Sequence, residues 1–372
     1  MQNIAVFYGG KSVEHDISVI TAVQTMQNLN RQKYNIIPVY QTKNCEFVCL
    51  KDYLSLKAYT NKLNNFKKVV FNFGKGTITL KGLISKTLKI DCAINCCHGN
   101  SGEDGTITAI CNLCNIPLTS CSILASSICM DKIIMKDIFV ANNIPCVDYV
   151  GLTKYEYNQN PDRCIKQITK KLGFPIIVKP SNLGSSIGIE KANNTEELEY
   201  ALDVAFTYDT RVIAEKCLED FKEVNISALG NYECELSEIE QPVNWQDFLN
   251  FEDKYISSGT NKKILNPKLD KNVKKQLHSL AKTIFKVFDL SGVIRIDFMV
   301  KENSVYVNEI NTVPGSLAFY LWKPKDIDFF ELIDRLIELA KQKHKENSLN
   351  NYTYKTDILN TFSENKGNKY SK

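Results

Sequence analysis

The chain has 372 residues, 44% of them hydrophobic and 24% charged, and its formal net charge is +4. This length predicts two or three soluble domains, and the scattered charge predicts no nucleic-acid surface. The sequence has no run of 18 apolar residues for a membrane span and no signal peptide, so we expect a cytoplasmic protein without a membrane partner.

The first 120 residues alternate strand and helix patterns. Apolar runs at 3–8, 34–40 and 89–99 predict buried strands, and apolar residues at helical spacing predict helices at 17–29 and 104–114. Strands that alternate with helices favour a parallel sheet covered on both faces. We therefore predict an N-terminal α/β domain over residues 1–120, with a Rossmann-like parallel sheet.

Thirteen cysteines are present, and seven of them lie in apolar segments between residues 92 and 129. Without export we expect these to be reduced, buried thiols. Cys111 and Cys114 have the spacing of a redox or metal motif, but no second pair follows at a zinc-like distance. Core packing is therefore the favoured interpretation.

A second domain is predicted over residues 121–215. It contains a helix at 128–145 and a strand at 174–180, and then the loop "KPSNLGSSIGIEK" at 179–191. Glycine admits backbone conformations that let a ligand approach, and serine offers hydroxyl and amide donors, so the loop is suited to an anion such as phosphate. The Walker order is absent, and an ordinary turn stays an alternative.

A third domain is predicted over residues 216–345, and residues 346–372 form a polar tail. The third domain contains a long polar loop at 240–263, followed by a helix at 273–290 and two strands at 293–300 and 305–313. The tail is rich in asparagine and lysine, which predicts weak order.

The last two strands carry the strongest indication of an enzyme. Alternate residues of a strand share a face, so "RID" places Arg295 beside Asp297, and "NEIN" places Glu309 beside Asn311. A three-residue hairpin at 302–304 sets Asp297 opposite Glu309, with Cβ atoms about 4.5–5.5 Å apart. Two carboxylates and an amide oxygen predict a Mg²⁺ site shared with phosphates. The alternative is a solvated strand face.

A magnesium site near a glycine loop and several lysines predicts a nucleoside triphosphate as ligand. Lys132 and Lys179 are candidate phosphate contacts because apolar residues flank them, although either one alone could be an ordinary surface lysine. Glu215 lies at a strand end, and Glu223 follows eight residues later. Acids at these positions could bind the adenine amino group and the ribose hydroxyls.

Jointly, these motifs resemble those of the D-alanine–D-alanine ligases, which are ATP-grasp enzymes of bacterial peptidoglycan synthesis. The resemblance covers residues 1–340, and eight segments carry it in order: "GGKSVEHDIS" (9–18), "HGNSGEDGT" (98–106), "MDK" (130–132), the glycine loop, "EK" (215–216), "DKY" (253–255), "RIDF" (295–298) and "NEINTVPG" (308–315). It implies an ATP-grasp fold, α+β in the later domains, and a homodimer.

The resemblance also implies how the substrates are held. Glu14 should bind the ammonium group of the first D-alanine and contact Ser185 and Tyr255. His98 should lie near the carboxylate of that substrate. The segment after Gly315 should receive the carboxylate of the second substrate, for which Ser316 is a shifted candidate.

ATP and two Mg²⁺ or Mn²⁺ ions are the implied cofactors. Phosphorylation of the first D-alanine should give an acyl phosphate, which the second amine attacks, with Arg295 and the Gly315 amide stabilising the oxyanion. Asp297, Glu309 and Asn311 should bind the metal ions. The residues implied to contact the nucleotide are Lys132, Lys179, Ser185, Ser186, Glu215, Lys216, Leu218, Glu223, Phe248, Lys254 and Asn308.

The segment "PGSLAFYLW", residues 314–322, departs from the family pattern because it is more apolar. The second substrate therefore stays open among D-alanine, D-serine, D-lactate and other amino acids. Two further alternatives are an inactive ATP-binding regulator and a nicotinamide-dependent oxidoreductase. The oxidoreductase is disfavoured because G-x-G-x-x-G is absent.

Overall fold

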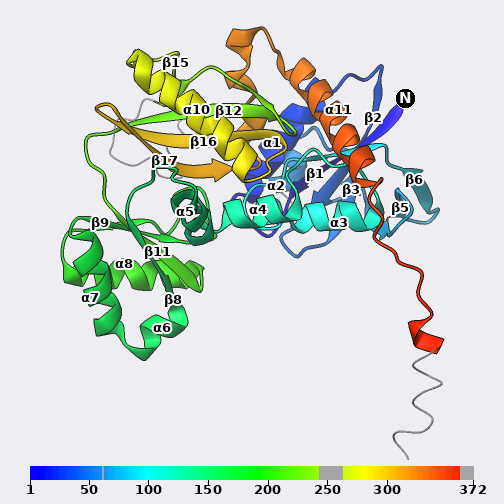
Figure 1. Ribbon diagram of the computed structural model, residues 1–372. Coiled ribbons are helices and arrows are strands. Elements are labelled where there is room, and N and C mark those ends of the chain that lie inside the picture. The colour runs from blue at the N-terminus through cyan, green and yellow to red at the C-terminus, as the bar shows by residue number, and fades with distance from the viewer. Residues whose placement is uncertain (61–62, 243–262, 361–372) are drawn as a thin grey trace, which may run out of the picture.

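The computed structural model describes residues 1–60, 63–242 and 263–360, which form three sheets with helices packed against them (Figure 1). The first sheet has seven strands in the order β6-β5-β4-β3-β2-β1-β7. Their bounds are β1 (Gln2–Gly9), β2 (Tyr34–Gln41), β3 (Phe47–Leu50), β4 (Phe66–Asn72), β5 (Thr77–Lys81), β6 (Lys86–Lys89) and β7 (Cys92–Asn95). Three helices accompany them: α1 (His15–Asn28), α2 (Lys57–Thr60) and α3 (Thr106–Cys114).

The expected parallel sheet is present only in its β2-β1-β7 part. There β1 pairs in parallel with β2 and β7, while β3 to β6 extend the sheet with antiparallel pairs. The four-residue turn at 73–76 between β4 and β5 explains this, because a parallel connection needs a crossover of a dozen or more residues. The sequence analysis assigned no element to this segment.

The second sheet is antiparallel throughout, in the order β10-β9-β11-β8. Its strands are β8 (Tyr149–Thr153), β9 (Ile176–Pro180), β10 (Glu190–Ala192) and β11 (Arg211–Lys216). The helices of this region are α6 (Lys154–Gln159), α7 (Pro161–Leu172) and α8 (Thr195–Tyr208). Buried residues of α7 and α8 pack against the strands in one apolar cluster, which fixes the sheet that precedes the glycine loop.

The third sheet contains the two strands with the carboxylates, in the order β15-β14-β12-β16-β17, and β13 pairs with β12. Its strands are β12 (Lys222–Gly230), β13 (Cys234–Leu236), β14 (Glu240–Pro242), β15 (Lys263–Leu265), β16 (Gly292–Lys301) and β17 (Ser304–Asn311). The later helices are α10 (Lys271–Val287), the 3₁₀ segments η1 (Gly315–Leu321) and η2 (Lys323–Lys325), and α11 (Phe329–Asn347).

The helix expected at 128–145 is divided into α4 (Ile123–Met130) and α5 (Lys132–Ala141). Asp131 separates them with an extended backbone, and its side chain accepts hydrogen bonds from the amides of Ile133 and Ile134. An aspartate in this position caps a new helix rather than continuing the old one. Both helices contribute buried residues to the same apolar cluster as α10 and the third sheet.

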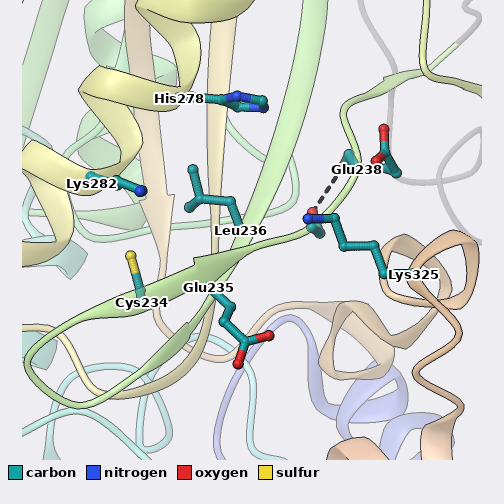
Figure 2. A pocket seen from close by; sticks show the side chains of 8 residues that line it. Cys234, Glu235, Leu236, Glu238, His278, Lys282 and Lys325 are labelled. Carbon is teal, nitrogen blue, oxygen red and sulfur yellow. Dashed lines mark hydrogen bonds between the residues drawn. The ribbon is translucent and has the colours of Figure 1, made fainter.

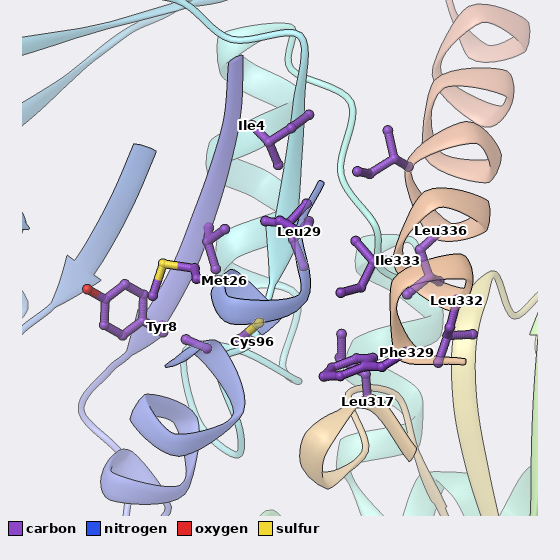
Figure 3. Packing of buried hydrophobic residues seen from close by; sticks show 14 of the residues in the cluster. Ile4, Tyr8, Met26, Leu29, Cys96, Leu317, Phe329, Leu332, Ile333 and Leu336 are labelled. Carbon is purple, nitrogen blue, oxygen red and sulfur yellow. The ribbon is translucent and has the colours of Figure 1, made fainter. Parts of the chain in front are cut away.

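The last helix packs against the first sheet, although at least 234 positions separate Phe329, where the helix begins, from Asn95, where the last strand of that sheet ends. Ile4 and Met26 share an apolar cluster with Leu317 of η1 and with Phe329 and Ile333 of α11 (Figure 3). Residues 347–360, which follow the body of this helix, are exposed. Among the helices of residues 1–60, 63–242 and 263–360, none combines the length and apolar character that a membrane span requires.

The cysteine prediction is confirmed. All thirteen cysteines lie in described residues and are free thiols. Cys111 and Cys114 are both buried in the core that α3 forms with the first sheet. Burial raises the pKa of the Cys114 thiol, as expected for a group that packs as a small apolar residue.

Candidate active site

Asp297 and Glu309 face each other across β16 and β17, as the sequence predicts, but a different turn produces this pairing. Lys301 pairs with Ser304, so the turn has two residues rather than three, and a bulge follows between Asp297 and Phe298. Asn308 is the extra residue of that bulge, since Phe298 pairs with Val307 and Asp297 with Glu309. Without the bulge, Asn308 would face Asp297.

The bulge also determines which side chains face the core. Val305 and Val307 are buried before it and Ile310 after it, so the buried positions change from odd to even numbers at Asn308. Glu309 and Asn311 therefore lie on the face opposite the core. Asp297 lies on this same face of β16, because Ile296 and Phe298 pack into the core.

Asp297 is the centre of a compact polar group. Arg295 donates two hydrogen bonds to its carboxylate, from Nε at 2.6 Å and from a terminal nitrogen at 2.7 Å. Asn311 donates a third from Nδ2 at 3.1 Å. Each carboxylate oxygen has two lone pairs, so these bonds leave acceptor capacity for a cation.

The glycine loop approaches the N-terminal end of α1. The hydroxyl of Ser185 donates a short hydrogen bond to the carboxylate of Glu14, and the Lys132 ammonium donates to the carbonyl of Leu183 at 2.7 Å. A Cβ at Gly184 would lie 2.8 Å from Glu14 Oε2, so a larger residue here would displace the Glu14 carboxylate. Left-handed backbone occurs at Ser185 and Ser186 as well as at Gly188.

Glu215 lies between two lysine ammonium groups in a buried ion-pair cluster. Lys136 approaches one carboxylate oxygen at 2.8 Å and Lys179 the other at 2.7 Å. Lys136 is fully buried, and Glu215 is 3% exposed. Burial raises the pKa of Glu215, but the two ammonium groups outweigh burial and hold the pKa at about 2. The carboxylate of Glu215 therefore orients the ammonium group of Lys179.

His98 connects the first sheet to the segment after β17. Its Nδ1–H donates to the carbonyl of Val313 at 2.7 Å, and Nε2 lies 2.7 Å from the hydroxyl of Thr21. Thr21 in turn accepts the amide N–H of Ser316 at 3.1 Å. Burial lowers the pKa of His98 and outweighs the opposing effect of Glu14, so the ring is neutral and Thr21 donates to Nε2.

One cavity brings these parts of the chain together. It is lined by Glu14 from the start of α1, Ser185 from the glycine loop, Lys132 from α5, and Glu309 and Asn311 from β17. These are five of the residues that the sequence selected. The cavity therefore combines carboxylates, an ammonium group and a pliant loop.

Among the described residues, the other predicted site residues do not line this cavity. Lys216 and Leu218 are at the end of β11, Glu223 is in β12, and a Cβ on Gly315 would meet open space. Phe248, Lys254 and Tyr255 lie outside the described residues.

The apolar segment "PGSLAFYLW" is apolar because it belongs to the core. Leu317, Ala318, Leu321 and Trp322 are buried, and the first two have left-handed backbone, as does Ser316. This turn directs the segment back under α1 and α11.

Two polar residues of the site were missed by the sequence analysis. Glu103 lines the cavity, and it stands in the quoted segment "HGNSGEDGT" five residues after His98. Lys136 lies four residues after Lys132 on the same helix, where residues four apart share a face. The motif segment and the helical spacing can both be read from the sequence, but neither one shows whether a charged side chain is buried or exposed.

A larger hollow of about 390 Å³ lies between β13, α10 and η2 (Figure 2). His278 and Lys282 extend from α10 toward Leu236, and Lys325 approaches from the other side. None of its lining residues belongs to the motifs, so the motifs select the smaller cavity as the active site.

Comparisons with known proteins identify the family of the chain. The family models described as "D-ala D-ala ligase N-terminus" and "D-ala D-ala ligase C-terminus" match residues 3–121 and 138–338. Proteins named D-alanine–D-alanine ligase from Thermosipho melanesiensis and Thermosipho africanus are 35% and 36% identical to the chain. The alignments cover 94% and 96% of it, and 96% and 98% of those proteins.

Solved structures give the same result. The D-alanine–D-alanine ligase of Coxiella burnetii has a TM-score of 0.80 at 26% identity, with 94% of this chain and 97% of that chain covered. A D-Ala:D-Ser ligase from Enterococcus faecalis has a TM-score of 0.79 at 28% identity, with 91% of this chain and 99% of that chain covered. The Bacillus anthracis D-alanine–D-alanine ligase complexed with ATP has a TM-score of 0.69 at 26% identity, with 93% of this chain and 100% of that chain covered. The chain belongs to the D-alanine–D-alanine ligase family and has its ATP-grasp fold.

Proposed function

We propose that this chain is an ADP-forming ligase that joins two D-alanine molecules into D-alanyl-D-alanine for peptidoglycan precursors. The observation that carries the proposal is the single cavity lined by Glu14, Ser185 and Glu309, which come from three distant parts of the chain. This combination suits the activation of an amino acid by ATP. Glu14 offers a carboxylate for an ammonium group, the loop at Ser185 can bind an anion, and Glu309 offers a carboxylate for a metal ion. The names of the curated relatives agree with this function.

The reaction begins with transfer of the γ-phosphoryl group of ATP to the carboxylate of the first D-alanine, which gives an acyl phosphate and ADP. The neutral amine of the second D-alanine attacks the carbonyl carbon and forms the C–N bond. The tetrahedral intermediate then breaks its C–O bond to phosphate, so that inorganic phosphate leaves and the nitrogen loses one proton. Glu14 binds the first ammonium group, and the hydrogen bond from Ser185 fixes its carboxylate. Arg295 and the Gly315 amide stabilise the oxyanion of the tetrahedral intermediate.

We propose that Asp297, Glu309 and Asn311 hold two Mg²⁺ or Mn²⁺ ions. The donor set fits hard cations, because two carboxylates and an amide from β16 and β17 lie on one face of the sheet and Asn311 contacts Asp297 directly. When bound, the ions neutralise phosphate charge. Arg295 keeps the Asp297 carboxylate oriented toward this face.

ATP binding is the second part of the proposal, supported by the ATP complex of the Bacillus anthracis relative. We assign phosphate contacts to Lys132, Lys179, Lys254, Ser185 and Ser186, and adenosine contacts to Glu215, Lys216, Leu218, Glu223 and Phe248. Asn308, as the extra residue of the bulge, is assigned to the nucleotide as well. The contacts of Phe248, Lys254 and Tyr255 stay predictions.

The domain limits at residues 120, 215 and 345, the homodimer and the cytoplasmic location also stay predictions. The buried cluster that joins the first sheet to α11 suggests that the first and third domains share a core. Size-exclusion chromatography with light scattering tests the dimer directly.

The function is tested with purified protein, ATP, Mg²⁺ and a panel of D-alanine, L-alanine, D-serine and D-lactate. D-Alanine alone is expected to give ADP and a product with the mass of D-alanyl-D-alanine, in equal amounts. L-Alanine is expected to give neither. ADP release that does not depend on D-alanine contradicts the proposal, and faster mixed-product formation with D-serine or D-lactate assigns a different second substrate.

Replacement of Lys179 tests the phosphate assignment. Lys179→Met is expected to raise the apparent KM for ATP by about tenfold or more, because one charge-assisted contact to phosphate is lost. The KM for D-alanine should change far less. Lys191→Met, at the exposed end of the same segment, is the matched control and should leave both constants near those of the wild type. An unchanged ATP dependence in Lys179→Met contradicts the assignment.

A further inference from the structure

Glu103 is a partly buried acid that lines the candidate active-site cavity, and the proposed mechanism does not use it. It lies in the loop between β7 and α3 and binds two backbone amides through separate oxygens. Oε2 accepts the N–H of Gly99 at 2.8 Å, and Oε1 accepts the N–H of Val313 at 3.0 Å. The second contact joins residues 210 positions apart, so Glu103 connects the loop after the first sheet to the segment after β17.

The segment that Glu103 reaches is held at both ends. Val313 is bound through its N–H by Glu103 and through its carbonyl by His98 at 2.7 Å. Three residues later, the N–H of Ser316 donates to Thr21 at 3.1 Å. Gly315 lies between these two anchors, and its amide is the proposed oxyanion donor.

We propose that Glu103 is a positioning residue for the ligation step, which sets the Gly315 amide at the oxyanion through its bond to Val313. This inference rests on the proposed ligase function and deepens it. An oxyanion donor is effective only at hydrogen-bond distance from the developing charge, so a small shift of its segment weakens catalysis. Glu103 acts through Val313 and does not touch the reacting atoms.

The two contacts require two acceptor oxygens at this position. Burial raises the pKa of Glu103 to about 8, and the carboxylate of Glu14 adds to the effect. Charged or neutral, a carboxyl group presents two oxygens that accept N–H groups. Glutamine presents one oxygen and one NH₂ group, so in Glu103→Gln one of the two backbone N–H groups must face another donor.

The test measures ADP and dipeptide in the same reaction. In Glu103→Gln, dipeptide formation is expected to fall about 100-fold, the effect of displacing a catalytic group by about 1 Å. ADP release should fall less, because phosphoryl transfer does not use the Gly315 amide. Water then attacks the waiting acyl phosphate and returns D-alanine and phosphate. The ratio of ADP to dipeptide should therefore rise above one.

Asp104→Asn is the matched control. The Asp104 carboxylate also accepts two backbone N–H groups, from Ser101 of the same loop at 2.9 Å and from Thr106 at the start of α3 at 2.8 Å, so both partners are within three residues of it. The same chemical change one residue away should keep the ratio at one. Loss of folded protein lowers ADP and dipeptide together, so the ratio separates a positioning role from instability.

Two results overturn the inference: a Glu103→Gln enzyme with the wild-type rate and ratio, or one in which ADP and dipeptide fall in parallel. Glu103→Asp provides a second variant, since its shorter side chain keeps a carboxylate that cannot reach both amides, and its ratio should also exceed one. A wild-type enzyme that forms no dipeptide contradicts the proposed function instead, so the two failures are distinguishable.

Discussion

Glu309→Gln is expected to reduce D-alanine-dependent ADP release by at least about 100-fold, which is the scale on which loss of one preorganised electrostatic contact reduces turnover. The change keeps the shape of the side chain but removes one negative charge from the proposed metal site. Glu309 faces Asp297 across the sheet, so no other carboxylate on β17 replaces it within the described residues. Raising the Mg²⁺ concentration should restore part of the activity, because the weakened site then fills more completely.

Glu302→Gln supplies the control for this experiment. Glu302 is exposed at the turn of the same hairpin, so the identical chemical change there should leave activity and Mg²⁺ dependence as in the wild type. Circular dichroism should give the same spectrum for both variants. Near-wild-type turnover in Glu309→Gln would remove Glu309 from the metal site and would leave the proposed mechanism without its cation.

Glu215→Leu is expected to lower the free energy of unfolding by about 3–5 kcal/mol, as when one partner of a buried ion pair is removed. The substitution leaves the ammonium groups of Lys136 and Lys179 close together and without their shared carboxylate. Urea unfolding followed by circular dichroism measures the effect. Lys136→Met should cost less, because Glu215 then keeps Lys179 as its partner.

The control for Glu215→Leu is Glu219→Gln. Glu219 forms an ion pair with Lys191 at 2.9 Å, but its side chain is 56% exposed, so solvent screens the interaction. The urea midpoint of the Glu219→Gln variant should stay close to that of the wild type. A Glu215→Leu midpoint equal to that of the wild type would contradict the assignment of this cluster to stability.

The contribution of Glu215 to the free energy of unfolding should decrease as the pH falls. Its pKa is about 2 in the folded chain and 4.5 in the absence of structure, so the folded state favours the charged form. The stabilisation is fully present above pH 4.5 and is lost as the pH falls toward 2. The difference between the wild type and Glu215→Leu should therefore be constant from pH 5 to pH 8 and should shrink at lower pH.

The sequence predicted the polar face of the catalytic strands for a physical reason. Strand periodicity alternates side chains between two faces, so the order of residues in "RID" and "NEIN" already groups the charged positions and separates them from Ile296 and Ile310. The same reasoning identified the glycine loop, whose residue types suit an anion wherever the loop lies. These are properties of short segments, and short segments are what a sequence specifies directly.

Strand periodicity did not predict the length of the hairpin turn or the bulge that follows it. A two-residue turn with a bulge at Asn308 and a three-residue turn without one produce the same opposition of Asp297 and Glu309. Strand pattern determines the face, whereas register depends on turn geometry and on packing against neighbouring strands. The prediction therefore reached the correct pair through an incorrect turn.

By itself, the sequence determined the family and selected the residues that we propose carry the chemistry, because each motif is local and its residue types fit one kind of ligand. Only the tertiary structure decided that Glu215 would be enclosed by Lys136 and Lys179, that α11 would pack on the first sheet, and that Glu103 would bind the amide of Val313. Such contacts join segments up to hundreds of residues apart, and their partners are selected by burial. A charged side chain that is costly to bury is held in place by whichever opposite charge or backbone group the folded core brings within reach.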